Sequence, residues 1–264
     1  MEDMYFYNKI LHGEALDDVF ILDNHMHLGK VNDFPVQCDD GQLVRMMDRC
    51  GVNAGCISSL LSLSEDFRKG NDEIRRLVKK YPGRFFGQIV INPNFPGEIR
   101  SELNRCWNMG GFRQIKIHPV FHQCDADDKK YLPVYQFASE KKISVLSHVW
   151  GVEQVKKFFN LAREYPDVIF ILGHSGGEIP AQRLAVELAN RYSNIVLDIT
   201  GSWHYEGMIE FMVREAGEDR VVFGSDAVFL DIFPAIGRVG MAGIPRQAKE
   251  KVFGLNMKRV LGLT

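Results

Sequence analysis

Two histidines separated by one residue stand at the end of an apolar run near the start of the chain. Residues 19–29 read Val-Phe-Ile-Leu-Asp-Asn-His-Met-His-Leu-Gly. Because side chains alternate between the faces of a β-strand, we expect Asp23, His25 and His27 on one face and the residues between them on the other. Two imidazoles on one face of a strand can bind one metal ion. The pair alone is also compatible with two structural histidines. The choice between this interpretation and a metal site therefore depends on the rest of the chain.

Further polar residues follow other strand-like segments. A single histidine there is often only a polar residue at the surface, and an aspartate after a strand is often a helix N-cap. Six of the eight histidines, however, stand at such ends or just beyond them, which coincidence explains poorly. Imidazole nitrogens with a carboxylate oxygen suit zinc or another divalent transition metal, whose bound water loses its proton near neutral pH. The candidates beyond the first pair are His118, His148, His174 and Asp226.

Strand-like and helix-like segments alternate along the whole chain. Several strand segments are continuously apolar, as parallel strands covered on both sides are. This alternation predicts an α/β fold, a (β/α)8 TIM barrel, in which active-site residues stand at the C-terminal ends of strands. An open doubly wound sheet is the alternative, but no glycine-rich phosphate-binding fingerprint follows the first strand. After the histidine pair, strands are expected at 54–61, 85–91, 112–118, 143–148, 168–174, 195–199 and 220–224. Helices are expected at 40–49, 71–81, 98–108, 132–141, 152–165, 180–192 and 206–216.

Length and composition fit one such barrel. The 264 residues are 45% hydrophobic and 25% charged, as is typical of a soluble globular protein. We expect a single domain over 1–264, with a lead-in segment at 1–17 and C-terminal helices at 232–264.

The net charge and the cysteines limit the classes of binding partner and the cellular location that we expect. The net charge of −2 disfavours nucleic acid as a partner, and no apolar stretch is long enough to span a membrane. Five cysteines without a Cys-x-x-Cys pair indicate reduced thiols, and the acidic start lacks the features of a signal peptide. A small-molecule substrate and a cytoplasmic location are therefore expected.

Taken in order, these motifs resemble the amidohydrolase superfamily. The resemblance is carried by Asp-x-His-x-His, Gly-Phe-Arg-Gln-Ile-Lys-Ile-His-Pro at 111–119, His148, His174-x-Gly-Gly and Gly-Ser-Asp226, and by the segments 194–198 and 256–263. It runs from about residue 20 to the end. The branch most similar includes aminocarboxymuconate semialdehyde decarboxylase, resorcylate decarboxylases and several lactone hydrolases.

The resemblance implies one divalent metal ion, zinc first, with Mn²⁺ or another divalent metal as alternatives. Its ligands would be His25, His27, His148 and Asp226. His174 would be the catalytic histidine, which takes a proton from metal-bound water or polarises a carbonyl. Asp226 would also accept a proton. Family members are often dimers, so a homodimer is a further expectation.

Other residues have weaker indications. Asp23 is expected to hold the imidazoles in orientation, and His118 to line the pocket. In binuclear relatives a lysine like Lys116 is carboxylated and bridges two metals; the alternative is a lysine paired with a carboxylate below the site. Arg183 could anchor a substrate carboxylate, although a surface arginine on a helix is the simpler interpretation.

Two sets of pocket residues are left open. An apolar wall is expected from Phe121, Trp150 and Trp203, which could equally pack against the helix layer. His122 could face substrate or solvent.

We therefore predict a metal-dependent hydrolase that acts on a lactone, amide or related carbonyl. Two alternatives stay open: a metal-dependent non-oxidative decarboxylase of a small aromatic or conjugated acid, and a TatD-type metal-dependent nuclease. The nuclease family carries a glutamate on the fourth strand, where this chain has no carboxylate. A catalytically silent barrel is disfavoured, because all the proposed ligands are present.

Overall fold

The fold is built on one sheet whose strands follow the order of the chain. The computed structural model describes residues 4–30, 37–201 and 205–263. Within them the nine-stranded sheet has the order β2-β1-β3 through to β9, and only β2 is antiparallel, which leaves eight parallel strands. The strands are β1 (Leu22–Lys30), β2 (Gln37–Cys38), β3 (Ala54–Ser59), β4 (Phe85–Val90), β5 (Phe112–Ile117), β6 (Ser144–Trp150), β7 (Phe170–Gly176), β8 (Ile195–Asp198) and β9 (Val221–Val222).

The sheet closes into a barrel where the chain after β9 meets β1. Asn24 N donates to Phe223 O at 2.9 Å, and Met26 forms a parallel bridge with Ala227. The first and last parallel strands are therefore neighbours, and the predicted (β/α)8 TIM barrel is confirmed.

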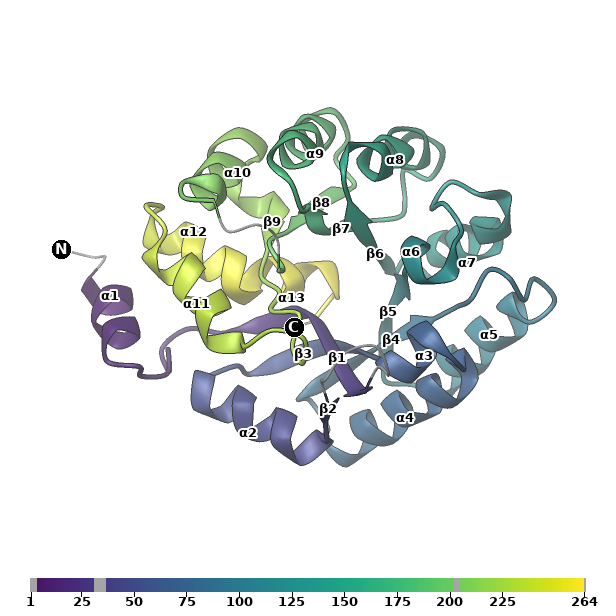
Figure 1. Cartoon of the computed structure of the whole chain (residues 1–264), viewed down its shortest axis with the longest axis horizontal. Helices are drawn as coiled ribbons and strands as arrows, with labels where there is room; N and C mark the ends of the chain where they lie inside the picture. The colour runs from purple at the N-terminus through teal and green to yellow at the C-terminus, as the bar shows by residue number, and fades with distance from the viewer. Residues whose placement is uncertain (1–3, 31–36, 202–204, 264) are drawn as a thin grey trace.

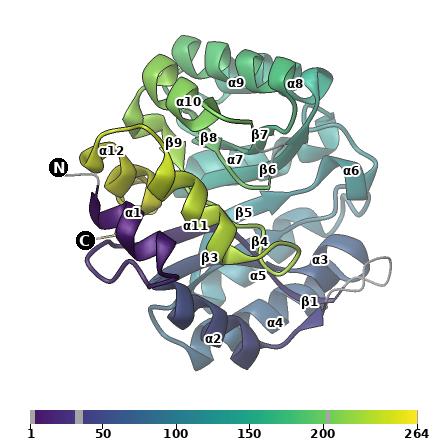
Figure 2. The same cartoon turned by 60° about the vertical axis from the view of Figure 1, so that its left-hand side comes forward.

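Helices surround the strands as an outer layer (Figures 1 and 2). The N-terminal helix α1 lies beside α11 and α12 at one side of the barrel (Figure 1). No helix in the described ranges has the length and apolar character needed to cross a membrane. The helices are α1 (Met4–Leu11), α2 (Asp40–Cys50), α3 (Leu60–Ser64), α4 (Phe67–Lys80), α5 (Ile99–Met109), α6 (Pro119–His122), α7 (Leu132–Lys141), α8 (Val152–Glu164), α9 (Ile179–Arg191), α10 (Met208–Ala216), α11 (Ile232–Met241), α12 (Arg246–Glu250) and α13 (Asn256–Val260). Shorter turns are 3₁₀ at Lys129–Tyr131 and Glu218–Arg220 and π-helical at Lys251–Leu255.

Two apolar clusters hold the layers together. The larger one lies between strands and helices. The smaller one joins strands that are not neighbours in the sheet, so it lies inside the barrel. It consists of Leu22, Ala54, Cys56, Leu146, Ile171, Val196, Val222, Met257 and Leu261. Burial of this apolar interior fixes the strands whose C-terminal ends carry the polar candidates.

Short helices account for the main differences from the sequence prediction. The lead-in contains α1, α3 begins within the last residues of the strand predicted at 54–61, and α6 follows the strand predicted at 112–118. Local caps explain α3 and α6: Ser59 accepts a hydrogen bond from Leu61 N, and His118 accepts one from Phe121 N. Such side-chain caps satisfy backbone N–H groups that a helix leaves unpaired at its start. Both helices, α3 and α6, are too short to show a helical period in the sequence.

Candidate active site

Strand β1 delivers the histidine pair to the barrel interior with an irregularity that the sequence does not reveal. Its pairing with β3 shifts register between Asp23 and Met26. At this point Asn24 Nδ2 lies 3.4 Å and His25 Nδ1 2.8 Å from the same oxygen, Oδ2 of Asp198. Two consecutive side chains therefore reach one carboxylate, and the prediction of plain alternation is wrong at Asn24.

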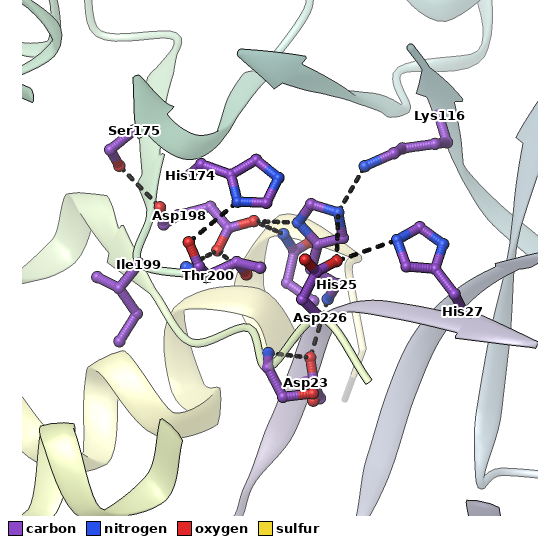
Figure 3. Close-up of polar contacts among 12 residues, drawn as sticks. Asp23, His25, His27, Lys116, His174, Ser175, Asp198, Ile199, Thr200 and Asp226 are labelled. Carbon is purple, nitrogen blue, oxygen red and sulfur yellow. Dashed lines mark hydrogen bonds and ion pairs between the residues drawn. The ribbon is translucent and has the colours of Figure 1, made fainter. Parts of the chain in front are cut away.

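Three of the four predicted metal ligands come together. The ligand atoms of His25, His27 and Asp226 all lie within 4.8 Å of one another. Asp226 Oδ1 is 3.2 Å from His27 Nε2 and 3.7 Å from His25 Nε2 (Figure 3). Two imidazole nitrogens and a carboxylate oxygen are a donor set that divalent transition metals take. The residues present thus fit the metal that the sequence predicts.

Three residues at this end of the barrel hold a backbone conformation that non-glycine residues rarely adopt. The φ angles of His174, Ser175 and Asp226 are 63°, 46° and 65°. The left-handed region costs such residues roughly 1–2 kcal/mol each. Backbone hydrogen bonds hold it in place, among them Asp226 N to His25 O at 2.9 Å. Strain of this kind is concentrated at functional sites, because it fixes side chains that the local sequence would not fix.

Asp198 orients His25 and was missed by sequence reasoning. Its Oδ2 accepts a hydrogen bond from His25 Nδ1, so His25 Nε2 carries a lone pair toward Asp226. Its Oδ1 accepts from both the backbone N and the hydroxyl of Thr200. Asp198 is fully buried, and burial raises its pKa. Its place at the end of β8 was the signal that could have found it.

Asp23, predicted to orient the imidazoles, contacts backbone instead. Its Oδ1 accepts hydrogen bonds from His25 N at 2.9 Å and Ser225 N at 3.1 Å. Burial raises the pKa of Asp23 to about 7. Because the register of β1 shifts at this point, Asp23 links this strand to the chain after β9. Asp198 is the carboxylate that orients the imidazole of His25.

The other two imidazoles of this region also have Nδ1 partners. His27 Nδ1 lies 3.0 Å from the hydroxyl of Ser58, a residue of β3 that the sequence did not single out. His174 Nδ1 lies 3.1 Å from Thr200 O. A carbonyl only accepts, so His174 carries its proton on Nδ1.

Lys116 reaches the site itself. Its Nζ lies 2.6 Å from His25 Nε2, and the residue is fully buried. Burial lowers the pKa of Lys116 to about 8, against the opposing charges of Asp226 and Asp198. The hydrogen-bond partner that the structure gives Lys116 is therefore a predicted ligand atom, and the two carboxylates act on Lys116 through their charge.

Burial favours the neutral forms of the imidazoles. It lowers the pKa of His25, His27 and His174 below the ordinary value. Burial would raise the pKa of Asp226, but the hydrogen bond with His27 and the neighbouring His25 and His174 outweigh it and hold that pKa below its usual range. Neutral imidazoles beside an ionised carboxylate are what metal binding requires.

His148, the fourth predicted ligand, lies outside this group. Its ring stacks on His118 with centroids 4.1 Å apart and planes 12° apart, and it lies 4.6 Å from the ring of His174. Phe121 stacks on His118 at 4.2 Å, and Trp150 lies edge-on to His174 at 5.6 Å. The rings of His118 and Trp150 therefore contact those of His148 and His174, and His148 remains a predicted ligand.

The remaining candidates that the structure describes lie away from the metal-ligand group. Arg183 lies exposed on α9, and no described contact links it to the site. His122 is buried with Nδ1 3.1 Å from the hydroxyl of Tyr131, so it faces neither solvent nor the group at β1. Trp203 lies outside the described residues.

Comparison with known proteins agrees with this architecture. The model of the family described as Amidohydrolase matches residues 63–263. The 5-carboxyvanillate decarboxylase of Sphingomonas paucimobilis has a similar structure, with a TM-score of 0.77 and 16% identity over 93% of this chain and 100% of that chain. A 2,6-dihydroxybenzoate decarboxylase from Rhizobium gives 0.78 and 16% over 92% and 99%. A dihydroxybenzoic acid decarboxylase from Polaromonas sp. JS666, with bound manganese and the inhibitor 2-nitroresorcinol, gives 0.77 and 17% over 92% and 97%. At such identities the structural likeness concerns the fold.

Proposed function

The chain belongs to the amidohydrolase family of enzymes, and from this premise we propose that it is a metal-dependent, non-oxidative decarboxylase of small aromatic acids. The observation that carries the proposal is the pairing of a ligand group with stacked rings. His25, His27 and Asp226 provide the ligand atoms, and the stack of Phe121, His118 and His148 stands beside them. A flat acid fits between a cation that would bind its carboxylate and an aromatic stack that packs against its ring.

The similar structures support decarboxylation over the hydrolysis that the sequence first suggested. These proteins are decarboxylases of 5-carboxyvanillate, 2,6-dihydroxybenzoate and dihydroxybenzoic acid, and one of them holds manganese. Manganese therefore takes precedence over zinc in the proposal. The nuclease alternative loses support, because the matching family model is that of Amidohydrolase.

The residues of the chain have separate tasks in this scheme. His25, His27 and Asp226, with His148 as the predicted fourth ligand, would hold a divalent metal, which would supply positive charge toward the acid group of the substrate. Thr200 fixes the tautomer of His174 by accepting from Nδ1, so Nε2 is the nitrogen that takes up a proton.

His174 moves one proton in the reaction. For a 2-hydroxy acid, its Nε2 takes the proton of the ring hydroxyl and returns it to the ring carbon that bears the carboxylate. The bond from that carbon to the carboxylate then breaks, its electron pair restores the aromatic ring as a phenolate, and carbon dioxide leaves. The phenolate takes its final proton from solvent. Acid–base help of this kind contributes roughly 10²–10⁴ in rate.

A substrate panel tests the proposal. Enzyme loaded with Mn²⁺ is incubated with mono- and dihydroxybenzoates, an aliphatic lactone and an aryl amide, and both carbon dioxide and organic products are measured. We expect carbon dioxide in a one-to-one ratio with a phenol from a 2-hydroxybenzoate. Opening of the lactone or amide without carbon dioxide release would replace decarboxylation by hydrolysis.

A further inference from the structure

The histidines of the site differ in which ring nitrogen carries the proton. Two of them present Nδ1 to groups that only accept: His25 to the carboxylate of Asp198 and His174 to the carbonyl of Thr200. Each therefore holds its proton on Nδ1 and keeps a lone pair on Nε2. This is the arrangement expected of a metal ligand and of a base.

His118 has the opposite arrangement. The group facing its Nδ1 is the backbone N–H of Phe121, at 3.3 Å. A backbone N–H only donates, so Nδ1 of His118 is the acceptor and carries no proton. A neutral imidazole has one proton on its nitrogens, and in His118 it must be on Nε2.

The surroundings of His118 leave this N–H for a ligand. Phe121 and His148 both stack on the ring, at 4.2 Å and 4.1 Å, so its faces are covered. The residue is only 8% exposed, and Nε2 has no hydrogen-bond partner in the part of the chain that the structure describes. A ring enclosed in this way meets a ligand through its edge, where Nε2 is the remaining polar atom. Nε2 of His118 is not among the fully enclosed polar atoms that lack a partner, so it is open to a ligand that enters the site.

We propose that His118 donates a hydrogen bond from Nε2 to an oxygen of the bound aromatic acid, and is therefore a substrate-binding residue of the site. The identity of the acid rests on the proposed function, whereas the position of the proton does not. The acid would then be bound from two sides. His118 would bind one acid oxygen from the side of the stacked rings, and the metal held by the ligand group would bind the other oxygens.

The competing explanation is that His118 only caps α6 through Nδ1. Two amide substitutions separate the roles, because the asparagine amide occupies the place of Nδ1 and the glutamine amide reaches the place of Nε2. H118N keeps an acceptor for Phe121 N but loses the donor; H118Q keeps a donor at Nε2 but loses the short-range cap. Substrate binding predicts a KM for H118N at least tenfold higher than for H118Q, with similar metal content. A cap alone predicts a lower melting temperature for H118Q and no such difference in KM, and this result would overturn the proposal.

A second measurement is independent of turnover. Long-range ¹H–¹⁵N spectra of ¹⁵N-histidine-labelled, Zn²⁺-loaded enzyme report which nitrogen of each ring is protonated, and H118Q identifies the signals of His118. We expect Nε2–H for His118 and Nδ1–H for His174. A proton on Nδ1 of His118 would refute the inference whatever the substrate is. Nε2–H together with no binding of any aromatic acid would instead refute the proposed function, and the ligand named here with it.

Discussion

The two sides of the site are built from different chemistry. The metal-binding side, formed by His25, His27 and Asp226, rests on β1 and the chain after β9. Each of its imidazoles has a polar Nδ1 partner, and its carboxylate is ionised. The aromatic side, formed by His118, Phe121, His148 and Trp150, rests on β5, β6 and the residues that follow β5. Its rings are arranged by stacking, and no carboxylate is described among them.

This difference indicates that one side of the site binds the cation and the other side binds the substrate ring. A cation needs donor atoms that are oriented in advance, and hydrogen bonds from Asp198 and Ser58 provide that orientation. A flat substrate needs an apolar surface to pack against, and the stacked rings provide one without introducing a competing charge. His174 lies between the two sides, with its ring 5.1 Å from His25 and 4.6 Å from His148.

The largest expected effect is on the metal-binding side. Asp226→Ala removes the only carboxylate of the ligand group, so we expect loss of bound metal and of activity. Asp226→Asn is the matched control for the backbone, because asparagine tolerates positive φ angles and isolates the effect of charge. Metal content after dialysis, measured by inductively coupled plasma mass spectrometry, checks both variants. Full retention of metal by Asp226→Ala would remove this residue from the ligand set.

Substitution of His148 tests whether this residue belongs to the metal-binding side or to the aromatic side. As the fourth predicted ligand, it should lose metal when changed to alanine, in contrast to His118→Phe, which keeps an aromatic ring in the stack. The same metal analysis compares the two variants. Equal metal content in both would place His148 wholly on the aromatic side.

His174 should affect rate without affecting metal. We expect His174→Asn, which suits its φ of 63°, to lower kcat by roughly 10²–10⁴ while metal content stays near that of the native enzyme. Steady-state kinetics and metal analysis of one preparation measure both quantities. Loss of metal in this variant would make His174 a ligand and reverse its assignment.

Asp198 should have a smaller effect that is confined to the metal-binding side. Asp198→Asn weakens the partner of His25 Nδ1, so we expect metal affinity to fall about 10- to 100-fold. Asp23→Asn is the control, because Asp23 Oδ1 accepts from the backbone N–H groups of His25 and Ser225 and not from an imidazole nitrogen. Competition with a chromogenic chelator measures both affinities. An effect of Asp23→Asn as large as that of Asp198→Asn would restore the role first expected of Asp23.

The sequence predicted the parts of this site that depend on strand ends. A polar residue after an apolar segment predicts a place at the barrel mouth, and His25, His27, His174 and Asp226 all lie there. The alternation of strands and helices likewise predicted the barrel, because it reflects burial on both faces of the sheet.

What the sequence did not predict depends on contacts between distant segments. The register shift in β1 follows from pairing with β3 and with the chain after β9, and nothing in residues 22–30 indicates it. Asp198 contacts His25 across 173 positions, so its strand-end position could mark it as a candidate but could not show that it, and not the nearer Asp23, contacts this imidazole. The cap by His118 involves one side chain and a four-residue helix, which leaves no periodic signal.

Anomalous diffraction from crystals of the Mn²⁺-loaded enzyme with a bound hydroxybenzoate analogue tests the division of the site most directly. We predict one manganese peak within about 2.0–2.3 Å of His25 Nε2, His27 Nε2 and an Asp226 oxygen, and an aromatic ring at the edge of the stack of His118 and Phe121. Two metal peaks bridged by Lys116, or a single peak among the rings of β5 and β6, would contradict the account.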